Sequence, residues 1–435
     1  MNNEMKKFVI CLAAMTLCGM VLTSCEREEE DGLSKVTYTA TSEAGSSKTW
    51  LNSSDELKWE KNESIMVSDG SRHTVYSTNG DVANDYSMAT FYCAAGQDVA
   101  GDVQVYYPSA NYVSDGVMSL PAEQRYSGTK GVVGFPMYTE SSDHELHFTN
   151  LCGLFSITLQ KAGKRVSSIT IVADKAVSGN FPVAASGSVW QLEAGEAVSN
   201  ASNTVVLDCN NPDNDSPSTF MGSTEPMQEE EPGVDITNAT VFNIYLPVGT
   251  YSIFDIVITA TDGTSCVKGL NGSGSLVIKR NERVTLTPAT LDFVEPIRYT
   301  TTDGSNLSDA FSSVAGNGTP KCVITRDGSQ WVANYASPVT NVDGYKFYSN
   351  QKLNSVVLPS TVISLGPAAF ANCGKLVDVT CYSQTVPTLG ASVFSNIGII
   401  WPATTTSAVL HVPSSMVSAY SGSSWYGYFA SIESL

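Results

Sequence analysis

The sequence has little positive charge and few of the side chains on which catalysis depends. Its 435 residues include 24 Lys and Arg against 43 Asp and Glu, a net charge of -19, and only four His. An acidic chain repels the phosphates of nucleic acids and offers no basic patch to anionic lipids. We therefore expect no nucleic-acid partner.

Long apolar runs and helical periodicity are also missing. No apolar run of spanning length follows residue 22, so the sequence predicts no transmembrane helix beyond that point. Short runs of alternating apolar and polar residues are frequent instead, and clusters of Gly, Asn and Asp separate them. Examples are Val103–Tyr107, Phe155–Leu159 and Val166–Val172. A period of two is typical of half-buried strands, so we expect a mostly β protein.

The length of the chain indicates more than one hydrophobic core. Residues 35–142 and 143–295 are each predicted to form an antiparallel β-sandwich, and a largely polar gap from Pro136 to Glu145 is the expected boundary. The stretch from Asn210 to Val234 is rich in Asp, Glu, Pro and Ser. We expect it to be a long exposed loop within the second sandwich.

The beginning of the chain has the pattern of a bacterial lipoprotein signal. Lys6–Lys7 precede an apolar run, Phe8–Val21, that is too short to span a bilayer. The pattern predicts a signal peptide over residues 1–24, cleavage between Ser24 and Cys25, and a diacylglycerol on the Cys25 sulfur. The acyl chains would then hold the protein on the lipid of an outer membrane. An ordinary secretory signal with a chance cysteine is the alternative.

Residues 25–34 are predicted to be the lipidated cysteine and an acidic tether. Glu26–Gly32 contains no apolar side chain, and its like charges repel one another. A short acidic run in this place resembles the signal that sends lipoproteins of Bacteroides-type bacteria to the outer face of the outer membrane. The predicted location is therefore the outer membrane, lipid-anchored and surface-exposed.

Once Cys25 is acylated and the signal is removed, an odd number of cysteines remains. They are Cys93, Cys152, Cys209, Cys266, Cys322, Cys373 and Cys381. Their wide and irregular spacing is not a disulfide framework, although the periplasm would allow one or two bridges. No two are close enough in sequence to suggest a metal knuckle, so we expect buried free thiols.

Several strand-and-turn patterns follow one another in the two predicted sandwiches. They are Lys48–Trp50 with Leu57–Trp59 and Ile65–Val67, then Tyr106–Pro108, then Phe148–Leu151 leading into Leu154–Ile157, and finally Tyr245–Tyr251 before Ile256–Gly263. In this order they resemble fimbrillin-like proteins, the FimA-type or type V pilins of Bacteroides relatives. The resemblance implies two tandem fimbrillin-like β-sandwich domains on the cell surface.

The C-terminal part contains an internal repeat. Val339, Val342, Phe347 and Leu353 recur 23 residues later as Val362, Leu365, Phe370 and Leu376; Leu358, Leu365 and Phe370 then recur as Cys381, Leu389 and Phe394. A period in the low twenties is that of leucine-rich repeats, in which apolar residues stack from rung to rung. The unit Leu358–Leu376 closely resembles the BspA-like leucine-rich repeat. We expect residues 296–435 to be such a region, a short β solenoid with caps, sealed at its end by Trp425.

The sequence contains no convincing catalytic or metal-binding pattern. His144 and His147 are three residues apart, which on a strand places them on opposite faces, and the helical HExxH pattern of zinc peptidases is absent. Asp208, Asp213 and Asp215 lack the turn glycine and bidentate glutamate of a calcium loop, so a solvated loop is favoured. We expect a protein that is not an enzyme and needs no cofactor or metal.

Aromatic side chains are the other candidate binding groups, because they can stack on sugars or peptides. The candidates are Tyr106, Tyr107, Tyr112, Trp331, Tyr345, Tyr348, Trp401, Trp425 and Tyr426. In sandwiches and repeat caps such residues usually pack inside, and this is the favoured interpretation.

The resemblance implies a fimbrial tip or accessory subunit, or an adhesin, that attaches through its repeat region. Its partners would be fimbrial subunits and a host or bacterial surface protein or glycan. Two alternatives stay open: a glycan-binding lipoprotein of a polysaccharide-uptake system, and an envelope protein without a specific ligand.

Type V pilins are thought to assemble after a protease removes a first strand, which a strand of a neighbouring subunit then replaces. On this chain the removable strand would be Val36–Ala40, and Lys48 would be the cleavage point. Lys48 as an ordinary loop residue is the alternative. A repeat region stands where a polymerising subunit would keep a free C-terminal strand, so a tip or accessory role fits better than a shaft.

Overall fold

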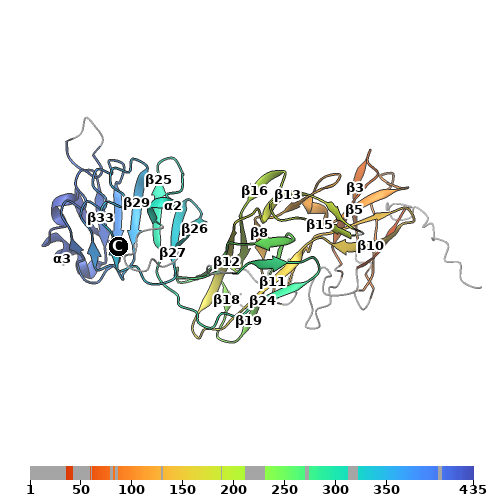
Figure 1. The fold of residues 1–435 in the computed structure, drawn as a ribbon, viewed down its shortest axis with the longest axis horizontal. Coiled ribbons are helices and arrows are strands. Elements are labelled where there is room, and N and C mark those ends of the chain that lie inside the picture. The colour runs from red at the N-terminus through yellow and green to blue at the C-terminus, as the bar shows by residue number, and fades with distance from the viewer. Residues whose placement is uncertain are drawn as a thin grey trace, which may run out of the picture.

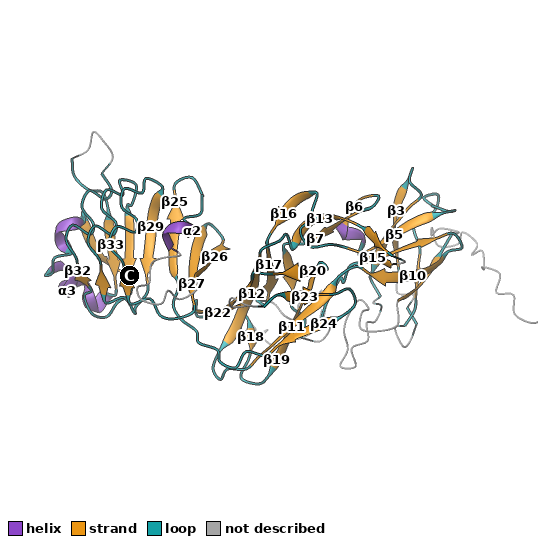
Figure 2. Cartoon of the chain, in the orientation of Figure 1, coloured by secondary structure: helices purple, strands orange, loops and turns teal. Residues whose placement is uncertain are grey.

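Strands account for almost all the regular structure of the chain, in a computed structural model of elongated shape (Figure 1). Helices are few and short (Figure 2). The structure describes residues 36–42, 59, 61–78, 82–83, 87–128, 131–187, 189–210, 231–269, 274–311, 322–399 and 404–435. Within these ranges no helix has the length and apolar character needed to cross a membrane. The prediction of a mostly β protein is confirmed.

A seven-stranded sheet forms the N-terminal end of the molecule. Its strands, in spatial order, are β3 (His73–Ser77), β2 (Ser64–Ser68), β5 (Val103–Tyr107), β9 (Met137–Ser141), β10 (Glu145–Asn150), β1 (Tyr38–Ser42) and β4 (Ala89–Phe91). Ser77 and Tyr92 exchange backbone hydrogen bonds of 2.8 and 2.9 Å, which join the two outermost strands. The sheet therefore curves round a core that includes Trp59, Phe91 and Phe148.

Two further sheets enclose the core of the second sandwich. The larger contains β22 (Ser265–Gly269), β21 (Phe254–Ala260), β12 (Arg165–Ala173), β17 (Thr204–Asp208) and β8 (Glu123–Arg125), with β18 (Val234–Asp235) also on β12. The smaller contains β19 (Thr240–Leu246), β11 (Gly153–Leu159) and β24 (Arg283–Leu286). Ile157 of β11 and Ile169 and Ile171 of β12 are fully buried between the sheets, and β11 is buried along almost its whole length.

Smaller strands lie between the N-terminal sheet and the second sandwich. They are β6 (Tyr112–Ser114), β7 (Val117–Leu120), β13 (Ser178–Pro182) and β16 (Ser199–Ser202) in one sheet, preceded by the 3-10 helix η1 (Ser109–Asn111), and the pairs β14 (Ala184–Ser186) with β15 (Val189–Gln191) and β20 (Gly249–Tyr251) with β23 (Leu276–Ile278). A shared apolar cluster lies beneath them, with Tyr106 from β5, Leu154 from β11 and Tyr245 from β19.

Strand pairing also crosses the boundary expected between the sandwiches. β7 and β8 precede residue 142 but pair with β13 and β17, whereas β10 follows it and belongs to the N-terminal sheet. The expected gap from Pro136 to Glu145 contains β9, because Met137, Tyr138 and Thr139 are buried ahead of polar residues. The gap is therefore a strand and not a linker, and the division at residue 142 stays a prediction.

The C-terminal region is built on a second seven-stranded sheet. Its order is β26 (Cys322–Asp327), β27 (Gln330–Tyr335), β25 (Ile297–Thr301), β29 (Leu353–Leu358), β31 (Asp378–Cys381), β33 (Val409–Val412) and β34 (Ser431–Ser434); β28 (Asn341–Val342), β30 (Ser364–Leu365) and β32 (Thr388–Leu389) form a parallel ladder beside it. Pairing is parallel from β29 to β34 and antiparallel among β25, β26 and β27. The short helices are α2 (Ser308–Phe311), η2 (Ser414–Met416), α3 (Val417–Ser421) and η3 (Tyr426–Tyr428).

The repeat spacing read from the sequence coincides with the register of these strands. Leu358 pairs with Cys381 and Leu365 with Leu389, as the shifts of 23 and 24 residues predict. The rings of Phe347, Phe370 and Phe394 stack at centroid distances of 5.0 and 5.3 Å and interplanar angles of 8° and 10°. One ring per rung thus forms a continuous stack inside the C-terminal core.

Backbone geometry repeats from rung to rung as well. Tyr345, Ala368 and Ser392 have positive φ angles of 62°, 52° and 58° at equivalent turns. The rungs approach so closely that a Cβ on Gly366 would lie 2.3 Å from the Gly344 nitrogen. Glycine is therefore required at this contact.

The end of the stack is covered by the final segment of the chain. The Trp425 ring lies 5.2 Å from both Phe394 and Tyr420, and its Nε1 donates a hydrogen bond of 2.9 Å to the Pro387 carbonyl oxygen. The side chain is fully buried with its polar atom satisfied. The predicted role of Trp425 as the closing residue is confirmed.

The burial predicted for the cysteines is confirmed for six of the seven and is partial for Cys322. Cys93, Cys152, Cys209, Cys266, Cys373 and Cys381 are buried, and Cys322 is half-buried. Burial raises the pKa of the Cys322 and Cys373 thiols to about 12, because the low-dielectric interior disfavours the thiolate. These thiols therefore pack as small apolar side chains and are poor nucleophiles.

Phe370 is the middle ring of the stack, so we predict that Phe370→Ala destabilises the repeat region by about 3–5 kcal/mol. The cost comes from lost burial and from the cavity left between two rings. Urea unfolding of the full chain measures it. Ile363→Ala is the matched control, since this side chain is 60% exposed, and its effect should stay within about 0.5 kcal/mol. Equal midpoints for the two variants would contradict the stacking account.

Candidate functional site

The first described strand, β1, occupies an interior position in the N-terminal sheet. Thr39–Ser42 pairs in parallel with Glu145–Phe148 of β10, and Tyr38–Ala40 pairs antiparallel with Ala89–Phe91 of β4. It begins two residues later than the strand expected at Val36–Ala40. Because both of its edges are hydrogen-bonded, removal of β1 would leave unpaired edges on β10 and β4.

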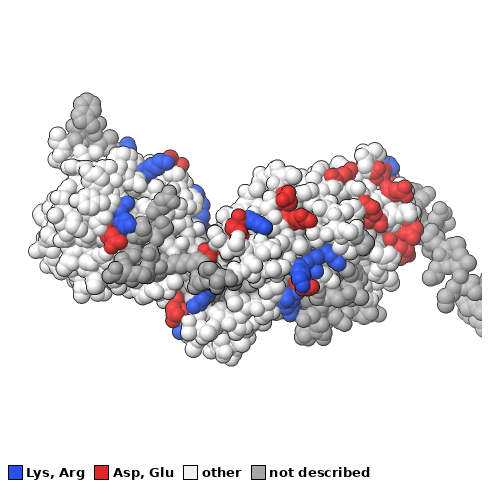
Figure 3. All heavy atoms as spheres, viewed as in Figure 1, with Lys and Arg blue, Asp and Glu red and all other residues white. Residues whose placement is uncertain are grey.

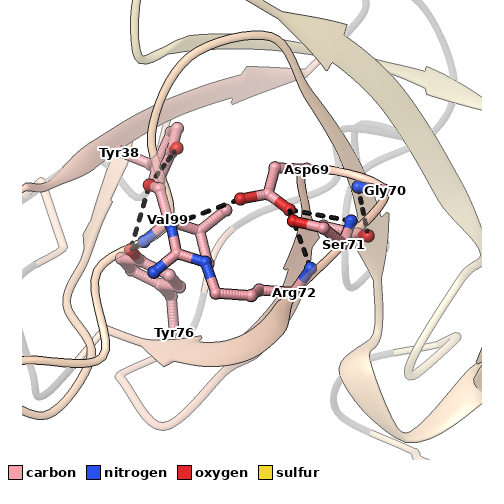
Figure 4. Close-up of polar contacts among 8 residues, drawn as sticks. Tyr38, Asp69, Gly70, Ser71, Arg72, Tyr76 and Val99 are labelled. Carbon is pink, nitrogen blue, oxygen red and sulfur yellow. Dashed lines mark hydrogen bonds and ion pairs between the residues drawn. The ribbon is translucent and has the colours of Figure 1, made fainter.

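A single aromatic side chain anchors β1 in the core (Figure 4). The Tyr38 hydroxyl donates a hydrogen bond of 2.8 Å to the Val99 carbonyl oxygen, and the Val99 N–H donates one of 2.9 Å to the Tyr76 hydroxyl. The Tyr38 and Tyr76 rings meet edge-to-face at 5.1 Å. Burial raises the pKa of Tyr38 to about 12, so the phenol stays a neutral donor.

The remaining side chains of β1 contribute little burial. Tyr38 and Ala40 are fully buried, whereas Thr39 and Thr41 are half-buried. Neighbouring β4 is similar, with Ala89 and Phe91 buried, whereas β10 buries the two larger side chains Leu146 and Phe148. β1 is therefore held by its two backbone ladders and by the Tyr38 anchor.

A tight turn beside this anchor connects β2 and β3. The Asp69 carboxylate accepts hydrogen bonds from the Ser71 N–H at 2.9 Å and from the Ser71 hydroxyl and the Arg72 N–H, both at 2.7 Å (Figure 4). The Ser71 and Arg72 donors hold the pKa of Asp69 well below its usual range. Acidic side chains gather over this end of the molecule on the face shown in Figure 3. Asp69 thus serves as a structural carboxylate of the turn.

The histidine pair of the sequence contacts β1. The His144 ring lies 5.3 Å from the Tyr38 ring, and its carbonyl oxygen accepts a hydrogen bond of 3.1 Å from the Thr39 N–H. His147 Nδ1 is 3.0 Å from the Thr41 hydroxyl oxygen. The histidines therefore pack along one strand, and no metal-binding group of three His, Cys, Asp or Glu gathers in the part of the chain that the structure describes.

Some predicted site residues lie outside the described residues. These are Ser24 and Cys25 at the signal cleavage and lipidation point, Lys48 as the maturation point, and Asp213 and Asp215 of the acidic loop. Asp208 is described at the end of β17, where its carboxylate accepts hydrogen bonds of 3.0 Å from the N–H and the side-chain amide of Asn210.

The aromatic candidates divide into buried and exposed groups. Tyr106, Tyr107 and Trp425 are buried, Tyr112 and Trp331 are half-buried, and Trp401 lies outside the described residues. Tyr345, Tyr348 and Tyr426 are exposed by 67%, 50% and 62%, and Tyr382, which the sequence did not single out, by 45%. The expected packing inside is thus correct for the buried group and wrong for the three exposed tyrosines. Tyr345 and Tyr348 lie at a turn of the repeat region, and Tyr426 lies in η3 of the closing segment.

Comparison with known families gives a match in the C-terminal region. Residues 336–423 match the family model described as BspA type leucine rich repeat region, in six copies. This part of the chain is a BspA-type leucine-rich repeat region. The match contains the phenylalanine stack and the parallel strands β29, β31 and β33, so the resemblance inferred from Leu358–Leu376 is confirmed. No curated protein sequence matches the chain.

Solved structures with a similar arrangement of strands include three proteins of related bacteria. A candidate cell adhesion protein from Bacteroides ovatus is 11% identical, with 59% of this chain and 94% of that chain covered and a TM-score of 0.33. Another from Bacteroides fragilis is 9% identical, with 59% and 96% covered and a TM-score of 0.30. The tip fimbrial protein Mfa3 from Porphyromonas gingivalis is 8% identical, with 59% and 96% covered and a TM-score of 0.25.

We predict that Tyr38→Phe lowers the free energy of unfolding by about 1 kcal/mol, the net worth of a typical hydrogen bond. The phenylalanine keeps the ring contacts with Tyr76 and loses only the bond to the Val99 carbonyl oxygen. The midpoint of urea unfolding of the full chain is the measurement. Tyr345→Phe removes a hydroxyl from an exposed ring and should leave the midpoint unchanged. An unchanged midpoint for Tyr38→Phe would show that the hydroxyl does not anchor β1.

Proposed function

We propose that this chain is a non-enzymatic cell-surface lipoprotein of the fimbrial tip or accessory type, and that it mediates attachment through its repeat region. One observation carries the proposal: β1 and the repeat region occupy opposite ends of an elongated molecule (Figure 1). The end that follows the acidic tether would face the membrane or a fimbrial partner. The repeat region would then be presented to a host or bacterial surface.

The geometry of β1 supports a role for its removal in maturation. Lys48 follows β1 by six residues in the sequence, so a cut there would leave β1 attached only through its ladders and Tyr38. A strand from a partner subunit could then pair with β10 and β4 in its place. In this proposal the acylated Cys25 leaves with the removed segment and serves as a transport device, not as a permanent anchor.

The arrangement of the last described strand favours a tip or accessory role over a shaft. β34 is paired in parallel with β33 from Val409↔Ser431 to Val412↔Ser434. To act as a donor for another subunit, it would have to leave this sheet and expose the core beneath Trp425. The chain is thus better suited to accept a partner strand than to supply one.

The glycan-uptake alternative would be favoured by a flat platform of three exposed aromatic rings. Tyr345 and Tyr348 are close, with ring centroids 5.8 Å apart, but their planes meet at 61°. This pair is therefore not a flat platform, and attachment remains the proposed function.

We predict that deleting the gene lowers attachment of the producing bacterium to extracellular-matrix coats or to partner bacteria. Antibodies against the repeat region should label intact wild-type cells. Counting attached cells on coated surfaces is the measurement, and re-expression of the full chain should restore attachment.

Cys25→Ser tests the transport role of the lipid. It should stop delivery of the chain to the surface and lower attachment as much as the deletion does, because a chain without the acylated cysteine is not carried to the outer membrane. Attachment that is unchanged by the deletion would refute the proposed function.

A further inference from the structure

The second sandwich and the repeat region meet through a small apolar contact. Val257 on β21 and Val267 on β22 pack against Val323 on β26 in one buried cluster. β22 lies beside β27 at this point (Figure 2). The outer face of one sheet therefore rests on the outer face of another, although each sheet encloses its own core on its other side.

A polar clamp stands next to this contact. The Arg298 guanidinium, on β25, donates a hydrogen bond of 2.9 Å to Asp327 Oδ2 and lies 3.5 Å from the Gly263 carbonyl oxygen of the second sandwich. On the same side, the Glu295 carboxylate accepts hydrogen bonds from the Ser360 N–H and hydroxyl. The contact between Arg298 and Gly263 joins the two parts, and the bonds to Asp327 and Glu295 fix Arg298 and the start of β25 beside it, so the adjoining surfaces are preorganised.

Two hollows open on either side of Arg298 and form one cleft. The first, of about 370 Å³, lies between the large sheet of the second sandwich and the β26–β27 hairpin. The second, of about 440 Å³, extends towards β29 and β31. Gly263, Pro296 and Arg298 line both. Clefts at domain interfaces in this size range are the usual place for small-molecule sites.

The first hollow is lined by groups that bind hydroxyls. They include the side chains of Ser168, Thr170, Thr259 and Thr325 and the carboxylates of Glu123 and Asp208. Serine and threonine hydroxyls both donate and accept hydrogen bonds, and carboxylates accept them. A ligand with many hydroxyls therefore finds partners on both walls.

The second hollow adds an apolar surface. Tyr382, directly after β31, is 45% exposed and lines this hollow with Val357 and Pro359. An exposed tyrosine offers an aromatic face on which the C–H face of a sugar ring can stack, while its hydroxyl stays in water.

We propose that this interdomain cleft binds a neutral oligosaccharide, with a sugar ring on Tyr382 and further units along the hydroxyl-lined hollow. The ligand is expected to be neutral because carboxylates outnumber cations in the cleft. Glu123, Asp208, Asp262, Glu295 and Asp327 line it. The cations in or beside it are Arg298, which pairs with Asp327, Arg326, which stacks on Trp331 at 4.8 Å, and Lys164, which pairs with Asp262. Anionic sugars would be repelled. This inference deepens the proposed function, on which it rests, by giving attachment a ligand class.

The test is calorimetric titration of the purified full chain with hexasaccharides. The neutral probes are the hexamers of glucose, mannose, galactose and N-acetylglucosamine, and the anionic probe is the hexamer of galacturonic acid. We expect at least one neutral hexamer to bind and the anionic hexamer to bind more weakly. Tyr382→Ala should weaken binding about tenfold, as expected for the loss of a ring-stacking contact.

Matched variants separate the cleft from the rest of the surface. Tyr345→Ala removes an exposed tyrosine elsewhere in the repeat region and should bind as the wild type does. Thr259→Val keeps the shape of a side chain in the cleft but loses its hydroxyl and should weaken binding. Thr250→Val, at an exposed position of β20 outside the cleft, should not.

The proposal is overturned if no neutral hexamer binds, if the anionic hexamer binds best, or if Tyr382→Ala and Tyr345→Ala have equal affinity. Failure of this test leaves the attachment assay unaffected, because cells could attach through a protein ligand. Conversely, hexamer binding without any attachment defect in the deletion strain would refute the proposed function and leave the cleft assignment standing.

Discussion

The hydrogen-bonded edges of β1 are the constraint on which the N-terminal end of this protein depends. β10 and β4 belong to the same sheet, and β1 lies between them. β1 therefore satisfies the backbone hydrogen-bonding groups on the facing edges of both strands. β1 pairs along both edges and has Tyr38 as its one large buried side chain. Another strand with one aromatic and one small apolar residue on its inner face could pair with the same edges. This position therefore suits the exchange of one strand for another.

The repeat region satisfies the edges of its strands in a different way. Its parallel strands pair from β29 to β34, and the rings of Phe347, Phe370 and Phe394 stack between rungs. Trp425 closes one end, and the antiparallel strands β25, β26 and β27 close the other against the second sandwich. The repeat region is thus capped by Trp425 at one end and packs on the second sandwich at the other. A cleft lined by both parts lies at this contact.

Individual strands and the repeat register could be predicted, because each depends on a pattern within one stretch of sequence. Alternation of apolar and polar residues predicts β5, β11 and β12. The 23-residue spacing predicts that Leu358 and Cys381 are equivalent positions, and they pair in the structure. Pairing between distant segments could not be predicted, because alternation shows which face of a strand is buried but not its neighbour. For this reason alternation does not predict the β1–β10 pair. The polar residues of Met137–Ser141 hide a strand, and no pattern marks Tyr382, which follows a buried cysteine, as exposed.

The most direct test of this account is whether β1 can be replaced after cleavage at Lys48. The purified chain is cut with a lysine-specific protease and passed through gel filtration with a labelled synthetic peptide of residues 36–42. The account predicts that the cut chain releases its own first strand and binds one labelled peptide, whereas the uncut chain and Lys48→Gln do not. A first strand that stays bound after the cut, or a peptide that binds the uncut chain equally well, would contradict it.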